Sequence, residues 1–377
     1  MSLVTDARNY STMLYWSENT DDCLIETGIQ RVVRNLALGL RNAGVDLVNV
    51  RWDSARRLPR LRSSTRDGAY HDWSCQEHSA EQHSWLLVPE ITDTLLSDGL
   101  DPVQVGKSLG LKVAAIVHDM IPMKYPDLYS GELLAIFRQY YRMFADADLI
   151  LATTNYVVAD FRAYMTANGL PVPPIVIIPL PAQLAATERC RAAKPFQADT
   201  LKLLTVSTWE PRKNLPRLLR ALQRAKTHTE RRIDLTLVGW RGLDTGYIAE
   251  VDALVADMDN VAILDWVDTE TLVSLYGAHD VSIYPSWEEG FGMPILESLW
   301  MATPCICHSG SSMGEIAPGG GTLLIDMTDE DTIFDVICRL AEDSHLVATL
   351  ALETTQRRLH TWAEYAGAVY SALDTHR

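Results

Sequence analysis

Two long stretches of this chain repeat one pattern, in which short apolar runs alternate with amphipathic segments of helical period. The first amphipathic segment, 28–43, places its apolar residues on one face, follows the N-cap residue Thr27 and stops at Gly44. Such alternation builds an α/β protein, with a mostly parallel sheet and helices on both faces. We predict helices also at 132–144 and 156–168, and strands at 45–50, 85–88, 112–117, 148–152, 175–178, 201–206, 233–238, 261–264, 281–284, 304–307 and 322–325.

A segment with little periodicity separates the two stretches. It contains Pro179, Pro181 and Pro195, and prolines interrupt regular elements. The 377 residues also suit two domains of about 150 residues each. We therefore predict an N-terminal Rossmann-like domain over 1–182, a linker over 183–200, a C-terminal Rossmann-like domain over 201–355 and a final helical segment over 356–377.

The composition excludes several classes of protein. A net charge of −16 repels a phosphate backbone, so nucleic acid is not an expected partner. No apolar run is long enough to span a bilayer, and the first residues lack the basic and apolar regions of a signal peptide. The six scattered cysteines indicate a reducing compartment. We expect a protein of the cytoplasm, or one peripheral to the cytoplasmic face of the membrane.

One basic segment stands out against the negative charge of the chain. Residues 51–66 contain six arginines and one acid. Two interpretations remain open for it: a solvated loop, or a patch for anionic lipid or a lipid-linked diphosphate acceptor. The arginines of that patch would be Arg56, Arg57, Arg60 and Arg62.

The segment S-W-E-E-G-F-G-M-P, 286–294, follows the predicted strand at 281–284. Its two glycines let backbone approach a ligand closely, and Pro294 suits the first position of a helix. A helix N-terminus favours an anion. Glu289 and Glu297 lie near the same opening. The alternative interpretation is a tight turn with two solvated carboxylates.

The segment S-T-W-E-P-R-K-N, 207–214, follows the predicted strand at 201–206. Arg212 offers a planar fork of donors and Lys213 a compact charge, a combination that can grip a diphosphate. A helix cap with a solvated basic pair is the alternative. Because both segments follow strands of one predicted domain, together they indicate a site for a nucleoside diphosphate.

These motifs resemble the nucleotide-sugar glycosyltransferases of family 4, which have the GT-B fold. The resemblance rests on V-S-T-W-E-P-R-K-N and Y-P-S-W-E-E-G-F-G-M-P-I-L-E, in which Glu289 and Glu297 match the paired glutamates of that family. The stretches T-G-I-Q-R-V-V-R-N-L and V-H-D-M-I-P-M-K-Y-P are similar to its N-terminal domain. The likeness is strong over 201–326, weaker before residue 80, and greatest to bacterial mannosyl- and rhamnosyltransferases that build surface polysaccharides.

For the C-terminal domain, the resemblance implies a role for each matching position. Arg212 and Lys213 would hold the donor diphosphate and stabilise the leaving group. Glu289 would face the donor sugar, and Glu297 would bind the ribose hydroxyls. The backbone that contacts sugar and phosphate would be that of Gly290, Phe291, Gly292 and Met293.

For the other positions, the resemblance places His118 near the reaction centre and brings the backbone of Gly28 close to the diphosphate. A loop histidine bonded to backbone is the alternative for His118. The base would lie against Asp265, Trp266 and Val267. Ser207 and Asp265 stand where relatives often have glycine. The first departure affects the approach to phosphate, and the second leaves the identity of the base open.

The resemblance implies two Rossmann-like domains facing each other across a cleft and a retaining transfer, with front-face attack by the acceptor. We expect mannose from GDP-mannose as the donor and a glycan or lipid-linked acceptor in polysaccharide or lipopolysaccharide synthesis. Rhamnosyl or glucosyl transfer from dTDP- or UDP-sugars, a GT-B phosphorylase or epimerase, and a non-catalytic sugar-binding scaffold are the alternatives. No cofactor or metal is expected, because the D-x-D triplets of the chain lie in predicted solvated turns.

Overall fold

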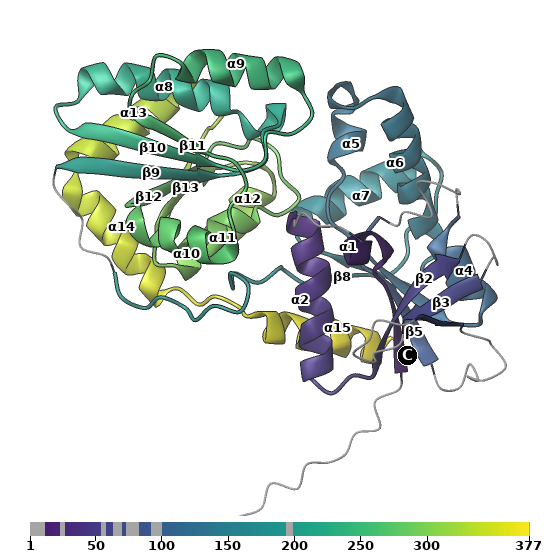
Figure 1. Ribbon diagram of the computed structural model, residues 1–377. Helices are drawn as coiled ribbons and strands as arrows, with labels where there is room; N and C mark the ends of the chain where they lie inside the picture. Colours follow the sequence, from purple (N-terminus) through teal and green to yellow (C-terminus); the bar gives the residue numbers. More distant parts are fainter. Residues whose placement is uncertain are drawn as a thin grey trace, which may run out of the picture. The chain divides into compact units, whose positions relative to one another are not determined.

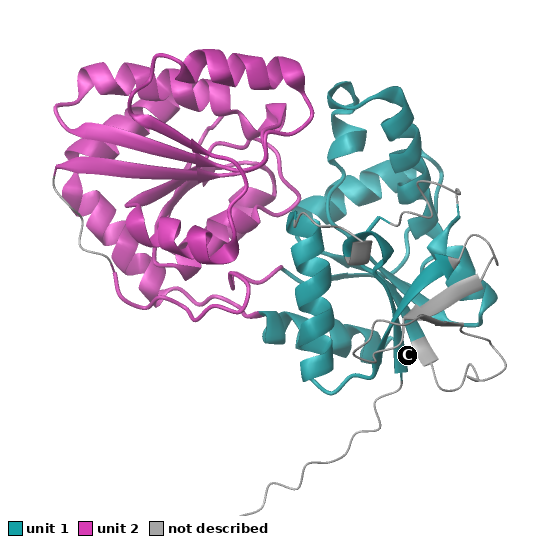
Figure 2. Cartoon of the chain, in the orientation of Figure 1, with its two compact units in different colours: residues 1–179, 362–377 teal, residues 180–361 magenta. Residues whose placement is uncertain are grey.

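The computed structural model describes residues 12–22, 27–53, 58–62, 70–72, 83–91, 100–193 and 199–376. The chain forms two compact units (Figure 2). Unit 1 comprises Met1–Pro179 together with Trp362–Arg377, and unit 2 comprises Leu180–Thr361. Each unit is built around one sheet with helices packed on it. The predicted α/β class, with two Rossmann-like parts, is therefore confirmed.

The sheet of unit 1 has eight strands in the order β4-β3-β2-β1-β5-β6-β7-β8. Six of them run parallel, and β3 (Leu58–Arg62) and β4 (Tyr70–Asp72) extend one edge in antiparallel pairing. The parallel strands are β1 (Thr12–Trp16), β2 (Leu47–Asp53), β5 (His83–Val88), β6 (Lys112–Val117), β7 (Leu149–Ala152) and β8 (Ile175–Ile177).

The strand β1 is the main departure from the predicted elements, because it occupies the middle of the sheet and was not foreseen. Leu14 and Trp16 pack in the hydrophobic cluster on one face of the sheet. On β1 the intervening Tyr15 is buried as well, and its hydroxyl donates to the carbonyl of Val33 on α2 (Gly28–Asn42) at 2.7 Å. Both faces of this short strand are buried, so it lacks the polar alternation that marks a half-exposed strand.

The last helix of the chain, α15 (Trp362–Thr375), belongs to unit 1 and packs against α2 (Figure 1). The contact needs a glycine: a Cβ on Gly39 would lie 2.7 Å from the Cβ of Ala366 and 3.1 Å from the carbonyl oxygen of Trp362. The remaining helical elements of unit 1 are α1 (Glu18–Asp22), α4 (Pro102–Ser108), α5 (Ile121–Lys124), η1 (Pro126–Leu128), α6 (Gly131–Met143), η2 (Phe144–Asp146) and α7 (Asn155–Ala167).

The sheet of unit 2 has six strands, all parallel, in the order β11-β10-β9-β12-β13-β14. Its predicted strands agree with the observed ones to within one residue at each end. The strands are β9 (Thr200–Val206), β10 (Arg232–Val238), β11 (Val261–Leu264), β12 (Val281–Tyr284), β13 (Cys305–His308) and β14 (Thr322–Ile325).

Helices cover both faces of this second sheet, with α8, α9 and α13 on one side and α10, α11 and α12 on the other (Figure 1). The core beneath the first group is mostly aliphatic and includes Leu203, Leu218 and Ile337. Across the described residues of both units, none of the helices combines the length and apolar character needed to cross a bilayer. The helical elements of unit 2 are η3 (Pro211–Lys213), α8 (Leu215–His228), α9 (Thr245–Val255), α10 (Thr269–Ala278), α11 (Met293–Trp300), α12 (Ser311–Ile316), α13 (Glu330–Glu342) and α14 (Ser344–Gln356).

Candidate functional site

The strand order of unit 2 reverses direction between β9 and β12. From β9 the chain continues outward to β10 and β11, and from β12 it continues the other way to β13 and β14. In open parallel sheets, the loops beyond the carboxyl ends of two such strands diverge and leave a crevice where ligands bind. Arg212 and Lys213 follow β9, and Glu289 follows β12. The topology therefore brings the two sequence motifs to one point.

The cations that follow β9 lie in the single turn η3, which ends abruptly. Asn214 adopts the left-handed conformation with φ 59° and closes the turn before α8. Its side-chain amide donates to the carbonyl of Met327 at 2.6 Å and to that of Pro285 at 3.3 Å. The loops after β14 and β12 thus hold the turn that carries Arg212 and Lys213.

The loop after β12 is bonded directly to the same turn. The N–H of Trp287 donates to the carbonyl of Arg212 at 3.1 Å, and the hydroxyl oxygen of Ser286 lies 3.1 Å from the same carbonyl oxygen. Farther along, Gly292 has φ 96°, a conformation that favours glycine, immediately before α11. The loop that carries Glu289 is thus fixed at both ends.

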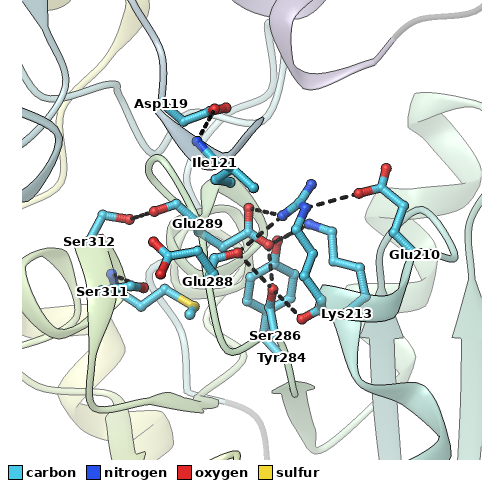
Figure 3. A network of polar contacts seen from close by, with 12 residues as sticks. Asp119, Ile121, Glu210, Lys213, Tyr284, Ser286, Glu288, Glu289, Ser311 and Ser312 are labelled. Carbon is cyan, nitrogen blue, oxygen red and sulfur yellow. Dashed lines mark hydrogen bonds and ion pairs between the residues drawn. The ribbon is translucent and has the colours of Figure 1, made fainter. Parts of the chain in front are cut away.

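The carboxylate of Glu289 is the centre of the polar cluster (Figure 3). One oxygen, Oε2, lies 2.8 Å from Nη1 of Arg212. The other, Oε1, accepts from three groups: Nζ of Lys213 at 2.5 Å, the Tyr284 hydroxyl at 2.8 Å and the Ser286 hydroxyl at 2.6 Å. Lys213 also donates to the Tyr284 hydroxyl at 2.9 Å. One carboxylate therefore joins both cations.

The pKa values of these groups follow from burial and mutual charge. Burial acts to raise the pKa of Glu289, but Arg212 and Lys213 outweigh it and lower that pKa to about 2. Burial and the charge of Arg212 lower the pKa of Lys213, whereas Glu289 and Glu210 act to raise it. Burial, followed by the charge of Glu289, raises the pKa of Tyr284 well above its usual 10. Tyr284 therefore remains a protonated hydroxyl that can donate to the carboxylate.

Arg212 is held by more than Glu289. Its Nε lies 2.9 Å from a carboxylate oxygen of Glu210, and Nη1 donates to the backbone carbonyl of Glu288 at 3.2 Å. These contacts fix the guanidinium from both motifs. The site thus holds a pair of oriented cations at the carboxyl edge of the sheet, an arrangement that suits an anionic ligand with more than one charge.

The other predicted donor residues of this unit are placed around the cluster. Glu297 lies on α11 with its side chain 1% exposed, and Gly290, Phe291 and Met293 are buried in the segment that enters that helix. The helix begins at Met293, so Pro294 takes its second position rather than the first. The predicted and observed positions of Pro294 differ by one residue. Proline has no N–H, and the N–H groups of the first helical turn have no acceptor within the helix, so the second position also suits it.

Ser207 ends β9, and the backbone beside it is tightly packed. A Cβ on Gly239 would lie 1.8 Å from the carbonyl oxygen of Ser207, so only glycine fits there, at φ 145°. The Ser207 hydroxyl is buried and has no hydrogen-bond partner among the described residues. A buried hydroxyl of this kind is usually hydrogen-bonded to a water or a ligand.

The loop after β11 carries the predicted base residues. Asp265 is exposed, and its carboxylate lies 3.3 Å from Nε of Arg241. The indole of Trp266 is 60% exposed, and Val267 is half-buried. Trp240 follows the adjacent strand β10 and is also partly exposed. Two indoles at neighbouring strand ends present flat apolar faces to a ligand.

Two predicted site residues belong to unit 1. His118 follows β6, and its Nε2 lies 2.7 Å from the carbonyl oxygen of Pro89, so Nε2 carries the proton and the ring is engaged with backbone. Burial lowers the pKa of His118, so the ring is neutral at pH 7. Gly28 is the first residue of α2 and follows the predicted N-cap, Thr27. The roles inferred for both residues stay predictions.

The arginine-rich segment, 51–66, is described only in part. Arg56 and Arg57 lie outside the described residues. Arg60 and Arg62 belong to β3, of which the structure describes the backbone. Part of the segment is therefore a strand of the sheet, paired with β2 and β4, rather than a loop.

Sequence reasoning missed the hydroxyl groups that complete the cluster. Tyr284 is the last residue of a correctly predicted strand, and Ser286 belongs to the motif, but neither was assigned a role. Both contact Glu289 through side chains. The available signal was position: the last residue of a parallel strand and the first residues after it face the crevice.

The architecture and the cluster define the class to which this domain belongs. Residues 200–343 match the family model of the glycosyl transferases group 1, so this part of the chain is a domain of that family. The matched range contains β9, η3, β12 and α11, and with them Arg212, Lys213 and Glu289. The resemblance to glycosyltransferases is confirmed.

Among characterised relatives, the chain is similar to O-antigen chain mannosyltransferase B of Escherichia coli, with 32% identity over 160 residues, 42% of each chain. It is also similar to the serotype-specific mannosyltransferase WbdA of Escherichia coli, with 23% identity over 312 residues, which cover 78% of this chain and 38% of WbdA. The chain therefore spans about two fifths of the length of these relatives.

Solved structures show the same fold over nearly the whole chain. Sucrose-phosphate synthase from Thermosynechococcus elongatus has a TM-score of 0.70 at 19% identity and covers 98% of this chain and 100% of its own. HepE from Anabaena, in complex with UDP and glucose, has a TM-score of 0.68 at 14% identity. The match covers 97% of this chain and 100% of the HepE chain. These neighbours confirm the expected GT-B fold.

Proposed function

We propose that this chain is a hexosyltransferase that takes its donor, a nucleotide sugar, in unit 2, with the donor diphosphate at Arg212 and Lys213. The observation that carries the proposal is the pair of cations, joined by one carboxylate at the point where the strand order reverses. That pair lies inside the domain that matches the glycosyl transferases group 1.

The chemistry of glycosyl transfer explains why such a pair is useful. Positive charge develops on the sugar ring and negative charge on the departing diphosphate. Fixed cations at the diphosphate stabilise the transition state more than the ground state. The buried hydroxyl of Ser207, at the end of β9, is available as a further donor to phosphate. The cations serve in place of a metal ion, and we infer that the reaction needs none.

We infer a retaining reaction with front-face attack, in which the leaving diphosphate takes the proton of the acceptor hydroxyl. The bond from the anomeric carbon to the phosphate oxygen breaks, and the acceptor oxygen forms the new bond on the same face. Glu297 would bind the ribose hydroxyls, and Asp265, Trp266 and Val267 would contact the base. Exposure of Trp266 supports the last assignment.

The preferred donor is GDP-mannose, because the similar Escherichia coli proteins are named mannosyltransferases. The acceptor would be a glycan or a lipid-linked precursor of an O-antigen-like polysaccharide, reached in the cytoplasm or at the cytoplasmic face of the membrane. UDP-glucose is the second candidate donor, since HepE has been solved with UDP-glucose.

A panel of nucleotides tests the proposal directly. GDP, UDP, ADP, dTDP and CMP are added without metal, and the melting temperature is recorded. A ligand at about one hundred times its dissociation constant stabilises the folded state by roughly 2.7 kcal/mol. A selective shift with GDP supports mannosyl transfer, and mass spectrometry then follows sugar transfer from GDP-mannose to a polysaccharide precursor. A selective shift of the melting temperature with UDP or dTDP overturns the assignment of GDP-mannose as the donor. No shift with any of the nucleotides favours a phosphorylase or a non-catalytic scaffold.

A further inference from the structure

We propose that the side chain of Asp265 selects the base of the donor. Its carboxylate accepts the two N–H groups that guanine presents side by side, so the site prefers a guanine nucleotide to the other nucleotides. The inference rests on the proposed function, because it concerns the nucleoside part of the same ligand. It gives the preference for guanine a structural cause, independent of the names of similar proteins.

The loop after β11, which carries Asp265, is bonded to the loops that follow the next two strands. The N–H of Gly239 donates to the carbonyls of Leu264 at 3.1 Å and Asp265 at 3.0 Å. The N–H of Trp209, after β9, donates to the carbonyl of Trp240, after β10, at 2.8 Å. The position of Asp265 is therefore set relative to the loop after β9, which leads to the turn with the two cations.

The spacing of the strands suits a nucleoside between that turn and Asp265. The strand β10 lies between β9 and β11, and neighbouring strands of a sheet are about 4.8 Å apart. The ends of β9 and β11 are therefore separated by about 10 Å. A nucleoside extends over a separation of this size, with its phosphate end at β9 and its base at β11.

The carboxylate of Asp265 is oriented by an arginine that two other residues hold in place. Nε of Arg241 lies 3.3 Å from Oδ1 of Asp265, and Nη1 of Arg241 donates to both carboxylate oxygens of Asp252 at 2.8 Å. The guanidinium also lies over the ring of Trp209, with Cζ 4.8 Å from the ring centre. The side chain of Asp265 nevertheless remains 72% exposed. It is thus a fixed acceptor that a ligand can reach.

The next residue supplies a flat apolar surface for the same base. The indole of Trp266 is 60% exposed. Proteins that read a single base commonly stack it on an aromatic or apolar side chain and bind its Watson–Crick edge through hydrogen bonds. An exposed ring and an oriented acceptor on consecutive residues provide both elements of such recognition.

The chemistry of a carboxylate distinguishes the bases, because a carboxylate accepts hydrogen bonds and donates none. Guanine offers two adjacent donors, N1–H and the N2 amino group. Adenine and cytosine each offer an amino group beside a ring nitrogen that is itself an acceptor. Uracil and thymine offer one N–H between two carbonyl oxygens, which a carboxylate repels. A carboxylate also repels a diphosphate, so Asp265 favours binding only when the base donates to it.

The experiment compares nucleotides that differ by single hydrogen-bond donors. Titration calorimetry records the affinities of the full chain for GDP, inosine diphosphate (IDP), UDP and inorganic pyrophosphate, in wild type and in Asp265→Asn. IDP is GDP without the N2 amino group, so the ratio of the GDP and IDP affinities reports the contact of that group. We expect wild type to bind GDP at least about tenfold more tightly than IDP, the effect of one hydrogen bond to a charged group.

In Asp265→Asn, the preference for GDP over IDP should fall at least about fivefold, because an amide oxygen accepts a weaker hydrogen bond than a carboxylate. Asp265→Ala removes the acceptor and should abolish the preference. Neither variant should weaken the binding of pyrophosphate or UDP, because neither ligand donates to this carboxylate in the way that guanine does. Both variants change an exposed side chain, so both should fold.

Asp268→Asn is the matched control, because it makes the same change of charge in the same loop. The carboxylate of Asp268 caps α10 by accepting from the N–H of Thr271 at 2.8 Å. Asparagine caps a helix as well as aspartate does, so the loop should keep its structure. The ratio of the GDP and IDP affinities should equal that of the wild type.

The outcomes separate the inference from the function on which it rests. If Asp265→Asn keeps the wild-type preference for GDP over IDP, the inference is wrong. It is also wrong if the wild type binds IDP or UDP as tightly as GDP, but the proposed function then stands with a different choice of base. If the wild type binds neither the nucleotides nor pyrophosphate, the proposed function and the inference fail together.

Discussion

Glu90 and Glu289 occupy the same topological position in two different sheets. Each follows the strand that lies beside the first strand of its unit, where the strand order reverses: Glu90 after β5 and Glu289 after β12. Glu90 accepts the backbone N–H groups of Asn19 at 2.9 Å and Thr20 at 3.0 Å, and it also pairs with the Thr20 hydroxyl. Glu289 accepts the side chains of Arg212 and Lys213.

This relationship explains why we expect an anionic ligand at the sheet of unit 2 and not at the same position in the sheet of unit 1. In unit 1, the backbone donors beyond β1 are satisfied by a carboxylate of the same unit, so the position that binds anions in many such sheets carries an internal anion. In unit 2, the carboxylate of Glu289 pairs with both Arg212 and Lys213. The two positive charges exceed its single negative charge, so these three groups together remain positive. We therefore expect diphosphate binding to depend on residues of unit 2 and to tolerate changes in the Glu90 network that leave unit 1 folded.

Arg212→Ala should reduce sugar transfer strongly, because it removes one of the two charges that we propose stabilise the leaving diphosphate. Loss of one such electrostatic donor costs about 2.7–4 kcal/mol, or about 100- to 1,000-fold in kcat. Steady-state kinetics with the preferred nucleotide sugar measures the effect. Arg220→Ala is the control, since this exposed arginine pairs with Glu250 and Glu330 on the helices. A kcat for Arg212→Ala within twofold of wild type would remove Arg212 from the site.

The ion cluster should also make stability depend on acid pH. The pKa of Glu289 is about 2 in the folded chain against 4.5 ordinarily, so folding favours the ionised form. The resulting stabilisation, about 3 kcal/mol, is complete above about pH 4.5 and is lost as the pH falls toward 2. For Glu289→Gln we expect a melting temperature roughly 6–12 °C lower at pH 7. Thermal melts from pH 7 to 2.5 should show the two curves converging below pH 4.5, and a constant gap would contradict the assignment.

The strands of unit 2 were predictable because each is a short apolar run between a polar turn and an amphipathic helix. β11, β12 and β14 begin and end at the predicted residues. β1 was not predictable in the same way, because its neighbours carry no helical pattern and both its faces are buried. The strand β3, next to the edge strand β4, was obscured by arginines and by Pro59, which conceal the alternation that defines a strand.

The charged residues of the site were predictable from the sequence, but the contacts between them were not. Arg212, Lys213 and Glu289 stand out as charged residues directly after predicted strands. Their contact depends on β9 pairing with β12, although about eighty residues separate them, and strand order is a tertiary property. The role of Tyr284 depends in turn on that contact. A single sequence therefore identifies the charged groups of the site but not the hydroxyl that joins them.

Removal of divalent metal should leave transfer unchanged. In the proposed site, Arg212 and Lys213 would supply the positive charge that a metal would otherwise bring to the diphosphate. In two of the D-x-D triplets, at 146–148 and 329–331, an aspartate already has partners within its own unit. Asp148 accepts the N–H of Val113 and pairs with Lys107, and Asp329 caps α13. Product formation, followed directly by mass spectrometry after treatment with EDTA, should remain within twofold. A loss that Mg²⁺ or Mn²⁺ restores would show that the donor needs a metal.

Trp266→Ala should weaken nucleotide binding without weakening pyrophosphate binding. An exposed indole contributes to the core very little, so the melting temperature should not change. Stacking of a base on an aromatic side chain is worth about 1–3 kcal/mol, which predicts roughly 5- to 150-fold weaker binding of GDP. Leu243→Ala is the control, because Leu243 is 86% exposed in the loop after β10. Equal losses for GDP and pyrophosphate would place Trp266 away from the base.

Gly39→Leu should destabilise unit 1 while leaving the diphosphate site intact. The new side chain would enter the contact between α2 and α15, where a Cβ already meets Ala366 at 2.7 Å. Overpacking of this kind costs about 1–3 kcal/mol, which lowers the melting temperature by roughly 2–12 °C. Gly367→Leu is the matched control, since the Cβ position at Gly367 on α15 has no neighbour within 4 Å. Calorimetry with pyrophosphate should give wild-type affinity for both variants, because the cations and their counter-ion lie wholly in unit 2. Weakened binding in Gly39→Leu alone would mean that the site depends on the packing of α15.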